Sequence, residues 1–198
     1  MAQAQVRLSW LPVGAGGHVV IYTSRWWELR QARREHRPPQ PLFHAALEVD
    51  AGTGTWVIEM APAWGRHRSP RGVVATGPVG HRILAVSPLF RYEVRCWPGG
   101  IIDDLAYAAG EPVVFPLSPA DAAALLRRTV QVPLHVWGTR MPGGDMWNSN
   151  SLASWLLEGS GIDAAELRPP EGGRAPGWAA GVQAARLPPA TAPDQLQS

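Results

Sequence analysis

Ser149 is the residue in this sequence best placed to act as a nucleophile. It lies in a small polar cluster that opens an apolar segment, and the pattern predicts a helix from about residue 150 to 158. A serine at a helix start gains from the positive end of the helix dipole and from free backbone N–H groups that can stabilise an oxyanion. A serine hydroxyl is a weak nucleophile by itself, so this chemistry also requires an adjacent base.

His44 is the best base that the sequence offers, because it lies inside an apolar strand where a polar ring needs a specific role. Residues 42–49 and 55–60 have the composition of strands, and the turn between them predicts a hairpin. Glu59 on the second strand would then lie beside His44 and orient its ring. The sequence thus predicts Ser149 as nucleophile, His44 as general base and Glu59 as orienting acid.

Further side chains near the helix start are predicted to contact a substrate. Small polar residues flank the nucleophile, a tryptophan precedes it and could form the wall of a groove, and an arginine from a later loop could bind a carboxylate. These residues are Trp147, Asn148, Asn150, Ser151 and Arg174. The polar ones also suit simple helix capping, the tryptophan also suits the core, and the arginine also suits a structural loop. Whether Ser149 or Ser151 carries the better-placed hydroxyl stays open.

The order of these segments resembles the circularly permuted papain-like proteins. The matching stretches are 43–49, 56–59 and 148–157, and the resemblance covers roughly residues 42–160. That group includes NlpC-type peptidases, the lecithin:retinol acyltransferase group and permuted deubiquitinase-like peptidases, in which a strand histidine precedes a helix-start cysteine. The resemblance implies a permuted papain-like core and a hydrolase or acyltransferase that acts on an amide or ester.

The sequence departs from that group at the nucleophile, because Ser149 stands where the group has cysteine. A thiol is partly ionised near neutral pH and a serine hydroxyl is not. Three alternatives therefore stay open. The protein is a serine-dependent enzyme, a catalytically inactive papain-like module that binds a peptide or acyl group, or a structural partner in a larger assembly.

The composition limits the other classes of function. The chain has 198 residues, so we expect one domain over 1–187 and a disordered tail over 188–198. Every basic residue is arginine, and the net charge is only +2. We therefore expect the arginine-rich run 25–37 to be solvated, with no nucleic-acid partner. Cys96 is the single cysteine, which excludes an intramolecular disulfide and a cysteine-based zinc site.

The pattern along the chain predicts an α+β fold, an antiparallel sheet with helices packed on one face. Helices are expected at 119–130 and 150–158. Strands are expected at 6–10, 18–22, 42–49, 55–60, 72–76, 81–86, 89–97 and 180–187, with a short extended segment at 132–136. We find no metal-binding or cofactor motif, no secretory signal and no membrane span. A cytoplasmic protein with a small-molecule, peptide or acyl substrate is the expectation.

Overall fold

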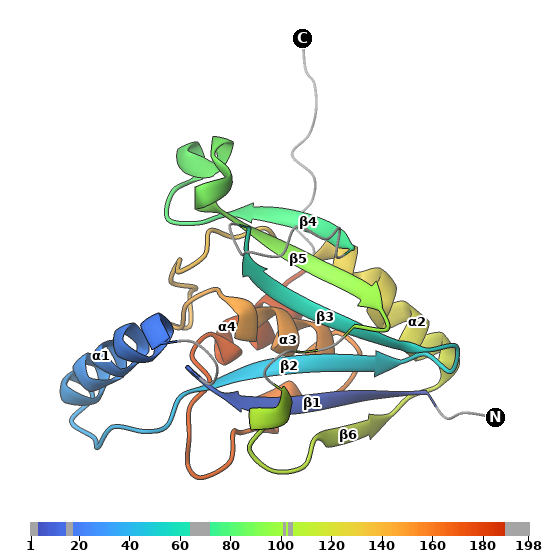
Figure 1. Ribbon diagram of the computed structural model, residues 1–198, viewed down its shortest axis with the longest axis horizontal. Coiled ribbons are helices and arrows are strands. Elements are labelled where there is room, and N and C mark those ends of the chain that lie inside the picture. The colour runs from blue at the N-terminus through green and yellow to red at the C-terminus, as the bar shows by residue number, and fades with distance from the viewer. Residues whose placement is uncertain (1–3, 15–17, 64–71, 101, 103–104, 189–198) are drawn as a thin grey trace.

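The computed structural model describes residues 4–14, 18–63, 72–100, 102 and 105–188, and the predicted tail falls outside these residues except for Pro188. The described residues form one six-stranded sheet and four α-helices, so the predicted α+β class is confirmed (Figure 1). The strands are β1 Gln5–Pro12, β2 Phe43–Asp50, β3 Thr55–Pro62, β4 Val73–Pro78, β5 Arg91–Pro98 and β6 Val113–Pro116. The helices are α1 His18–Arg34, α2 Pro119–Arg128, α3 Ser149–Glu158 and α4 Trp178–Arg186.

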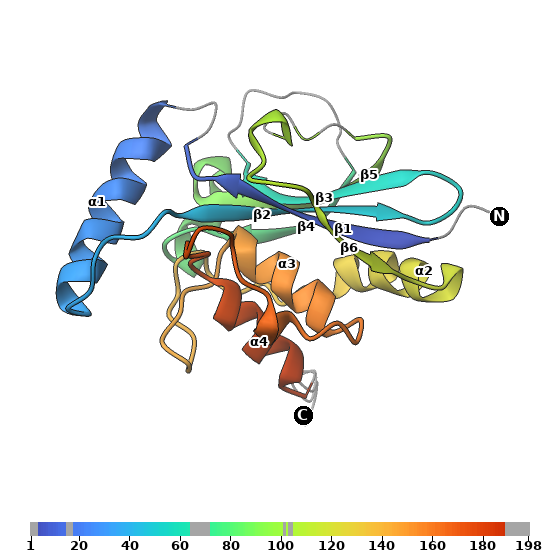
Figure 2. The same cartoon turned by 90° about the horizontal axis from the view of Figure 1, so that it is seen from below.

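The sheet has the strand order β4-β5-β3-β2-β1-β6, and every neighbouring pair is antiparallel. Helices α2, α3 and α4 cover one face, whereas α1 lies beyond the end of β1 and β2 (Figure 2). Alternate residues of each strand face these helices and form the core, as the period-two geometry of a strand requires. Leu8, Leu47 and Val94 are examples from three strands, each almost fully buried.

Helix α3 is the central helix of the covered face. All of residues 150–157 are buried, because the helix lies between the sheet and its neighbours α2 and α4. Helix α4 packs against it at Gly181, where a Cβ atom would collide with the backbone oxygen of Ser151 and the hydroxyl of Ser154. The hydroxyl of Ser154 donates to the Trp178 carbonyl at 2.7 Å and so joins the two helices.

The strands β2 and β3 separate partway along their length. Their ladder runs from Asp50 and Thr55 only as far as Leu47 and Ile58. Beyond this point β3 continues to pair with β5, and β2 continues to pair with β1. A gap therefore opens in the sheet between the two strands, and α3 lies behind it (Figure 1).

Four of the predicted extended segments are wrong. Residues 18–22 are the first turns of α1, continuous with the strong helix formers that follow them. Residues 82–86 form a 3-10 helix capped by His81. Segment 132–136 contains Pro133, which cannot donate to a ladder, and it is irregular. Residues 178–186 form α4, because their alanines favour a helix and bury one side of it.

The two predicted helices are confirmed. Ser118 caps α2 by accepting the Asp121 N–H at 3.1 Å, and Pro119 occupies the first helical position. Helix α3 begins at Ser149, one residue before the expected start. Within the described part of the chain, no helix is long and apolar enough to cross a membrane. The cytoplasmic location stays a prediction.

The close approach of α3 and α4 predicts a specific cost of adding one methyl group. We expect Gly181→Ala to lower the free energy of unfolding by about 1–3 kcal/mol, because neither helix backbone can move away without losing core contacts. Gly143→Ala is the matched control, since its Cβ would meet only the flexible end of Gln183. Urea unfolding of both variants measures the difference. An equal effect of the two substitutions would contradict the proposed close packing.

Candidate active site

His44 and Ser149 are in direct contact. The Oγ atom of Ser149 lies 3.0 Å from Nδ1 of His44, although the two residues are 105 positions apart. His44 comes from β2, and Ser149 is the first residue of α3. Both side chains are half-buried. The structure thus brings together two of the three residues expected to be catalytic.

Asn150 fixes the helix start against the strand. Its Oδ1 accepts the Ala45 N–H at 2.8 Å, and its Nδ2 donates to the Phe43 carbonyl at 3.0 Å. Phe43 and Ala45 flank His44, and these backbone groups lie where β3 has left β2 unpaired. Nδ2 also donates to the Pro176 carbonyl at 2.9 Å. Asn150 therefore positions the dyad of His44 and Ser149, and its polar groups are already occupied, so we assign it no contact with a substrate.

Asn148 and Ser151 form a capping box at the same helix start. The Asn148 side chain accepts the Asn150 N–H at 2.9 Å, and the Ser151 hydroxyl accepts the Asn148 N–H at 3.0 Å. Ser151 is fully buried and donates to the Gly177 carbonyl at 2.7 Å. Of the two serines, Ser149 is the one whose hydroxyl contacts His44, whereas the Ser151 hydroxyl is bonded within the helix cap.

The loop before α4 completes this framework. Asp145 accepts the N–H groups of Gly177 and Ala179 at 2.9 Å and 3.2 Å, and so holds the loop in place. Gly177 has a φ of 92°, which favours glycine, and a Cβ there would collide with the Asn148 side chain. The carbonyl of Pro176 then reaches both Asn148 and Asn150. The roles of Asp145 and Pro176 are not predictable from local sequence, because their contacts join distant segments.

The backbone donors at the helix start are mostly occupied. Asn148 accepts the Asn150 N–H through its side chain and the Ser151 N–H through its carbonyl, the latter at 3.0 Å. Within the described residues, the N–H of Ser149 itself has no acceptor. The oxyanion site expected at this position is therefore reduced to one free backbone donor.

Burial makes His44 a weak base. Packing around the half-buried ring reduces its contact with water and lowers its pKa to about 4, so the ring is neutral at neutral pH. A neutral ring can accept a proton from Ser149 only at the nitrogen that carries none, so Nδ1 would be the acceptor and Nε2 would hold the ring proton. No described residue accepts a hydrogen bond from Nε2.

Glu59 does not reach His44. The predicted hairpin is present, but its ladder ends at Ile58, one residue before Glu59. The Glu59 carboxylate lies 3.8 Å from Arg95, and Arg95 in turn binds Glu93 at 2.6 Å. No hydrogen bond joins Glu59 to His44, although both line the same small cavity. The expected orienting contact is therefore missing from the described part of the site.

That cavity, at the gap between β2 and β3, has a volume of only about 10 Å³. It is bounded by His44 and Glu59 on the sheet and by Ser149 and Leu152 on α3. A space of this size holds about one water molecule. A substrate could place its reacting bond against the dyad, but the rest of the molecule must lie elsewhere.

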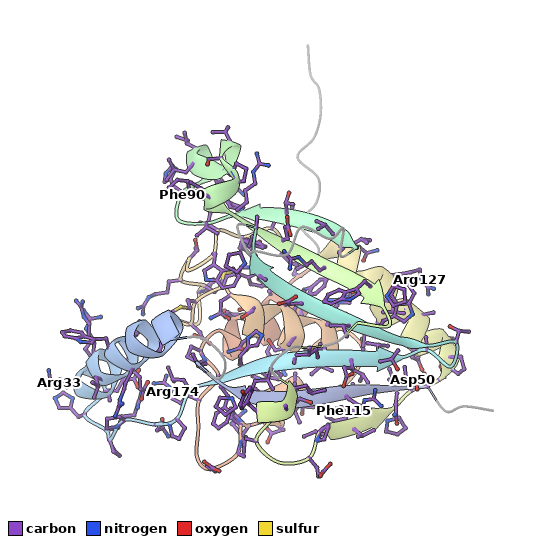
Figure 3. All side chains as sticks on the ribbon, viewed as in Figure 1. Arg33, Asp50, Phe90, Phe115, Arg127 and Arg174 are labelled. Carbon is purple, nitrogen blue, oxygen red and sulfur yellow. The ribbon has the colours of Figure 1, made fainter. Side chains whose placement is uncertain are left out.

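The side chains of Trp147 and Arg174 have their contacts outside the dyad, although the Arg174 carbonyl accepts the Phe43 N–H at 2.7 Å. Trp147 is fully buried, with its ring 4.9 Å from that of His135, so it belongs to the core and forms no groove wall. Arg174 binds the Glu35 carboxylate at 3.0 Å and lies 3.7 Å from that of Glu28. It therefore binds carboxylates of its own chain, beside α1 (Figure 3).

The described residues contain no cluster of three or more His, Cys, Asp or Glu side chains that could hold a metal ion. Cys96 is buried on β5, and burial raises the pKa of its thiol to about 11. It stays protonated at neutral pH and lies in a strand that carries neither His44 nor Ser149. Cys96 therefore does not replace the cysteine that is missing from the dyad.

Comparisons with known proteins identify no family. No family model matches the chain, and no solved structure matches it. A stretch of 52 residues is 46% identical to immunoglobulin-like domain-containing receptor 1 of Pongo abelii. This match covers 24% of the chain and 9% of that receptor, so it is too short to show kinship.

The bridging role of Asn150 predicts a large effect on stability. We expect Asn150→Ala to lower the free energy of unfolding by about 3 kcal/mol, because it leaves the Ala45 N–H and the Phe43 carbonyl without these partners and removes one of two donors to the Pro176 carbonyl. Urea unfolding checks this value, with the exposed Gln131→Ala as control. A loss below about 1 kcal/mol would show that water replaces these bonds.

The low pKa of His44 predicts a pH-dependent stability. Between pH 6.5 and pH 4 the unfolded chain binds a proton that the folded chain does not. The free energy of unfolding is therefore expected to fall by up to about 3 kcal/mol as the pH drops through this range. Urea unfolding of the wild type and His44→Gln measures it, and the variant should lose this part of the slope. Identical slopes would mean that His44 titrates normally.

Proposed function

We propose that this protein is a hydrolase or acyltransferase acting on an amide or ester bond, with Ser149 as nucleophile and His44 as general base. The observation that carries the proposal is the 3.0 Å contact between the serine hydroxyl and the imidazole at the start of a buried helix. The order of the segments, which resembles that of permuted papain-like proteins, adds support. The group transferred would be acyl, since a serine–histidine pair activates an oxygen for attack on a carbonyl carbon.

The reaction follows from the positions of the two side chains. His44 takes the Ser149 proton at Nδ1 while Oγ attacks the carbonyl carbon, and the carbonyl oxygen becomes an oxyanion. The free N–H of Ser149 is the donor available to that oxyanion. The imidazolium then returns the proton to the leaving amine or alcohol, and an acyl-serine ester remains. A water molecule or a second acceptor, deprotonated by His44, attacks the ester and releases Ser149.

The site also sets a limit on the rate. A histidine with a pKa of about 4 accepts a proton less readily than one near its ordinary value. One backbone donor stabilises an oxyanion less than two would. Slow turnover is therefore expected, unless the bound substrate changes the surroundings of the dyad.

The second candidate function is a binding module that recognises a peptide or acyl group without cleaving it. The pairing of Glu59 with Arg95 favours it, because His44 is left without an orienting acceptor. The two functions make the same prediction for binding and opposite predictions for covalent labelling.

Labelling with a fluorophosphonate, followed by intact-mass measurement, tests the enzyme proposal. We expect one adduct on the wild type and none on Ser149→Ala or His44→Ala, because attack requires both the hydroxyl and the base. Ser87→Ala, which removes a hydroxyl that caps a 3-10 helix, is the control and should label like the wild type.

The absence of an adduct on the folded wild type would contradict the role of Ser149 as nucleophile. An adduct that persists in Ser149→Ala would place the reactive group elsewhere. Circular dichroism of each variant confirms that any lost labelling does not come from unfolding.

A further inference from the structure

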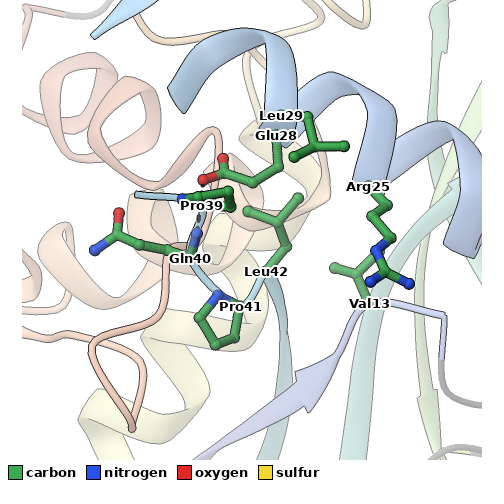
Figure 4. Close-up of a pocket in the computed structure, with 8 residues that line it drawn as sticks. All are labelled: Val13, Arg25, Glu28, Leu29, Pro39, Gln40, Pro41 and Leu42. Carbon is green, nitrogen blue, oxygen red and sulfur yellow. Dashed lines mark hydrogen bonds between the residues drawn. The ribbon is translucent and has the colours of Figure 1, made fainter. Parts of the chain in front are cut away.

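A second and much larger cavity has Leu42 in its wall, two residues before His44. It has a volume of about 340 Å³, is open to solvent on one side, and lies between α1 and the segment that leads into β2 (Figure 4). Cavities of this size accept small-molecule ligands. Its wall is mainly aliphatic and comes from Val13, Leu29, Pro39, Pro41 and Leu42.

One residue of the cavity wall, Leu42, belongs to the same extended segment as His44. Leu42 precedes His44 by two residues, and Val13 N–H donates to the Leu42 carbonyl at 2.8 Å, so the β1–β2 pairing extends past the named strands. Residues two apart in an extended chain face the same side and lie about 7 Å from each other. The part of the cavity wall formed by Leu42 is therefore about two residues from His44 along β2.

Two charged side chains line the cavity, and they differ in whether a partner binds them. Glu28 is almost fully buried, and its carboxylate accepts the Gln40 N–H at 2.9 Å and binds Arg37. Figure 4 shows this carboxylate turned toward Gln40, whereas the Arg25 guanidinium lies beside Val13. Within the described residues, Arg25 has no hydrogen bond or ion pair. The cavity thus has a neutralised acid and one cation available for a ligand.

Helix α1 brings these groups to the cavity. Arg25, Glu28 and Leu29 are spaced three and four residues apart, so they share one side of the helix. Glu28 connects this side to Gln40 and Arg37, and through them to the segment that leads into β2. The same contact that holds α1 in place therefore also sets the position of Arg25 above the aliphatic wall.

We infer that this cavity binds the recognition part of the substrate, an aliphatic group that carries a free carboxylate. The aliphatic group packs against Leu29 and Leu42, and the carboxylate pairs with Arg25. Only the carbonyl oxygen of the amide or ester would fit the small space at the dyad. This inference rests on the proposed function for the identity of the reacting bond, whereas the binding of the carboxylate is independent of catalysis.

Calorimetric titration with 6-acetamidohexanoate, in which an aliphatic chain joins an amide to a carboxylate, tests the inference. The neutral 6-acetamidohexanamide, in which the carboxylate is replaced by a carboxamide, is the paired ligand. We expect the wild type and Ser149→Ala to bind 6-acetamidohexanoate equally, and both to bind the neutral ligand at least about tenfold more weakly. Arg25→Gln should bind 6-acetamidohexanoate about tenfold more weakly than the wild type, with no change for the neutral ligand.

Two further variants make the result specific. Arg30→Gln removes an exposed arginine of α1 that does not line the cavity, and it should bind like the wild type. Leu29→Trp fills the cavity from its exposed helix side and should abolish binding of both ligands. Equal binding of the two ligands, equal effects of Arg25→Gln and Arg30→Gln, or full binding by Leu29→Trp would each overturn the inference.

The test separates this inference from the proposed function. Binding that depends on Arg25, together with no fluorophosphonate adduct, would support the carboxylate site and refute the serine enzyme. An adduct on Ser149 without binding dependent on Arg25 would keep the enzyme and refute this site. No saturable binding by the folded wild type would also refute it.

Discussion

The side chain of Asn150 is the interaction on which the site depends. Strand β3 leaves β2 after Ile58, and the backbone groups of Phe43 and Ala45 would otherwise be buried without partners. One amide satisfies both of them, and it also binds the Pro176 carbonyl. These hydrogen bonds hold the first turn of α3 against β2, and this position brings Ser149 into contact with His44.

The contacts that order the dyad also lower its chemical reactivity. Burial keeps His44 neutral and rigid, but it also weakens the ring as a base. The capping box holds Ser149 in place, but it uses backbone donors that an oxyanion would need. The features that make the arrangement precise are thus the same ones that limit its reactivity. A ligand bound in the larger cavity would change the surroundings of the dyad, and with them the reactivity of His44 and Ser149.

Much of this architecture could be predicted from local patterns. The hairpin, α2, α3 and the pair of His44 and Ser149 follow from periodicity, caps and the rarity of a polar ring in an apolar strand. The position of Glu59 could not, because it depends on where a ladder ends, and no local signal in the sequence sets that point. The strand predicted at 180–187 is wrong because that prediction neglects the helix preference of the alanines and the packing of α4 on α3, which is a contact between separate segments.

The sequence separation across the gap has a consequence for folding. His44 and Asn150 belong to segments more than 100 residues apart, and every bond that fills the gap joins these segments or the later loop at Pro176. Contacts of such range form late, since loop closure must come first. The hairpin of β2 and β3 can form early, but its open end stays an unpaired edge until α3 docks. Assembly of the dyad and closure of this edge are therefore one event, so a chain interrupted before that event exposes a site for mispairing with another strand.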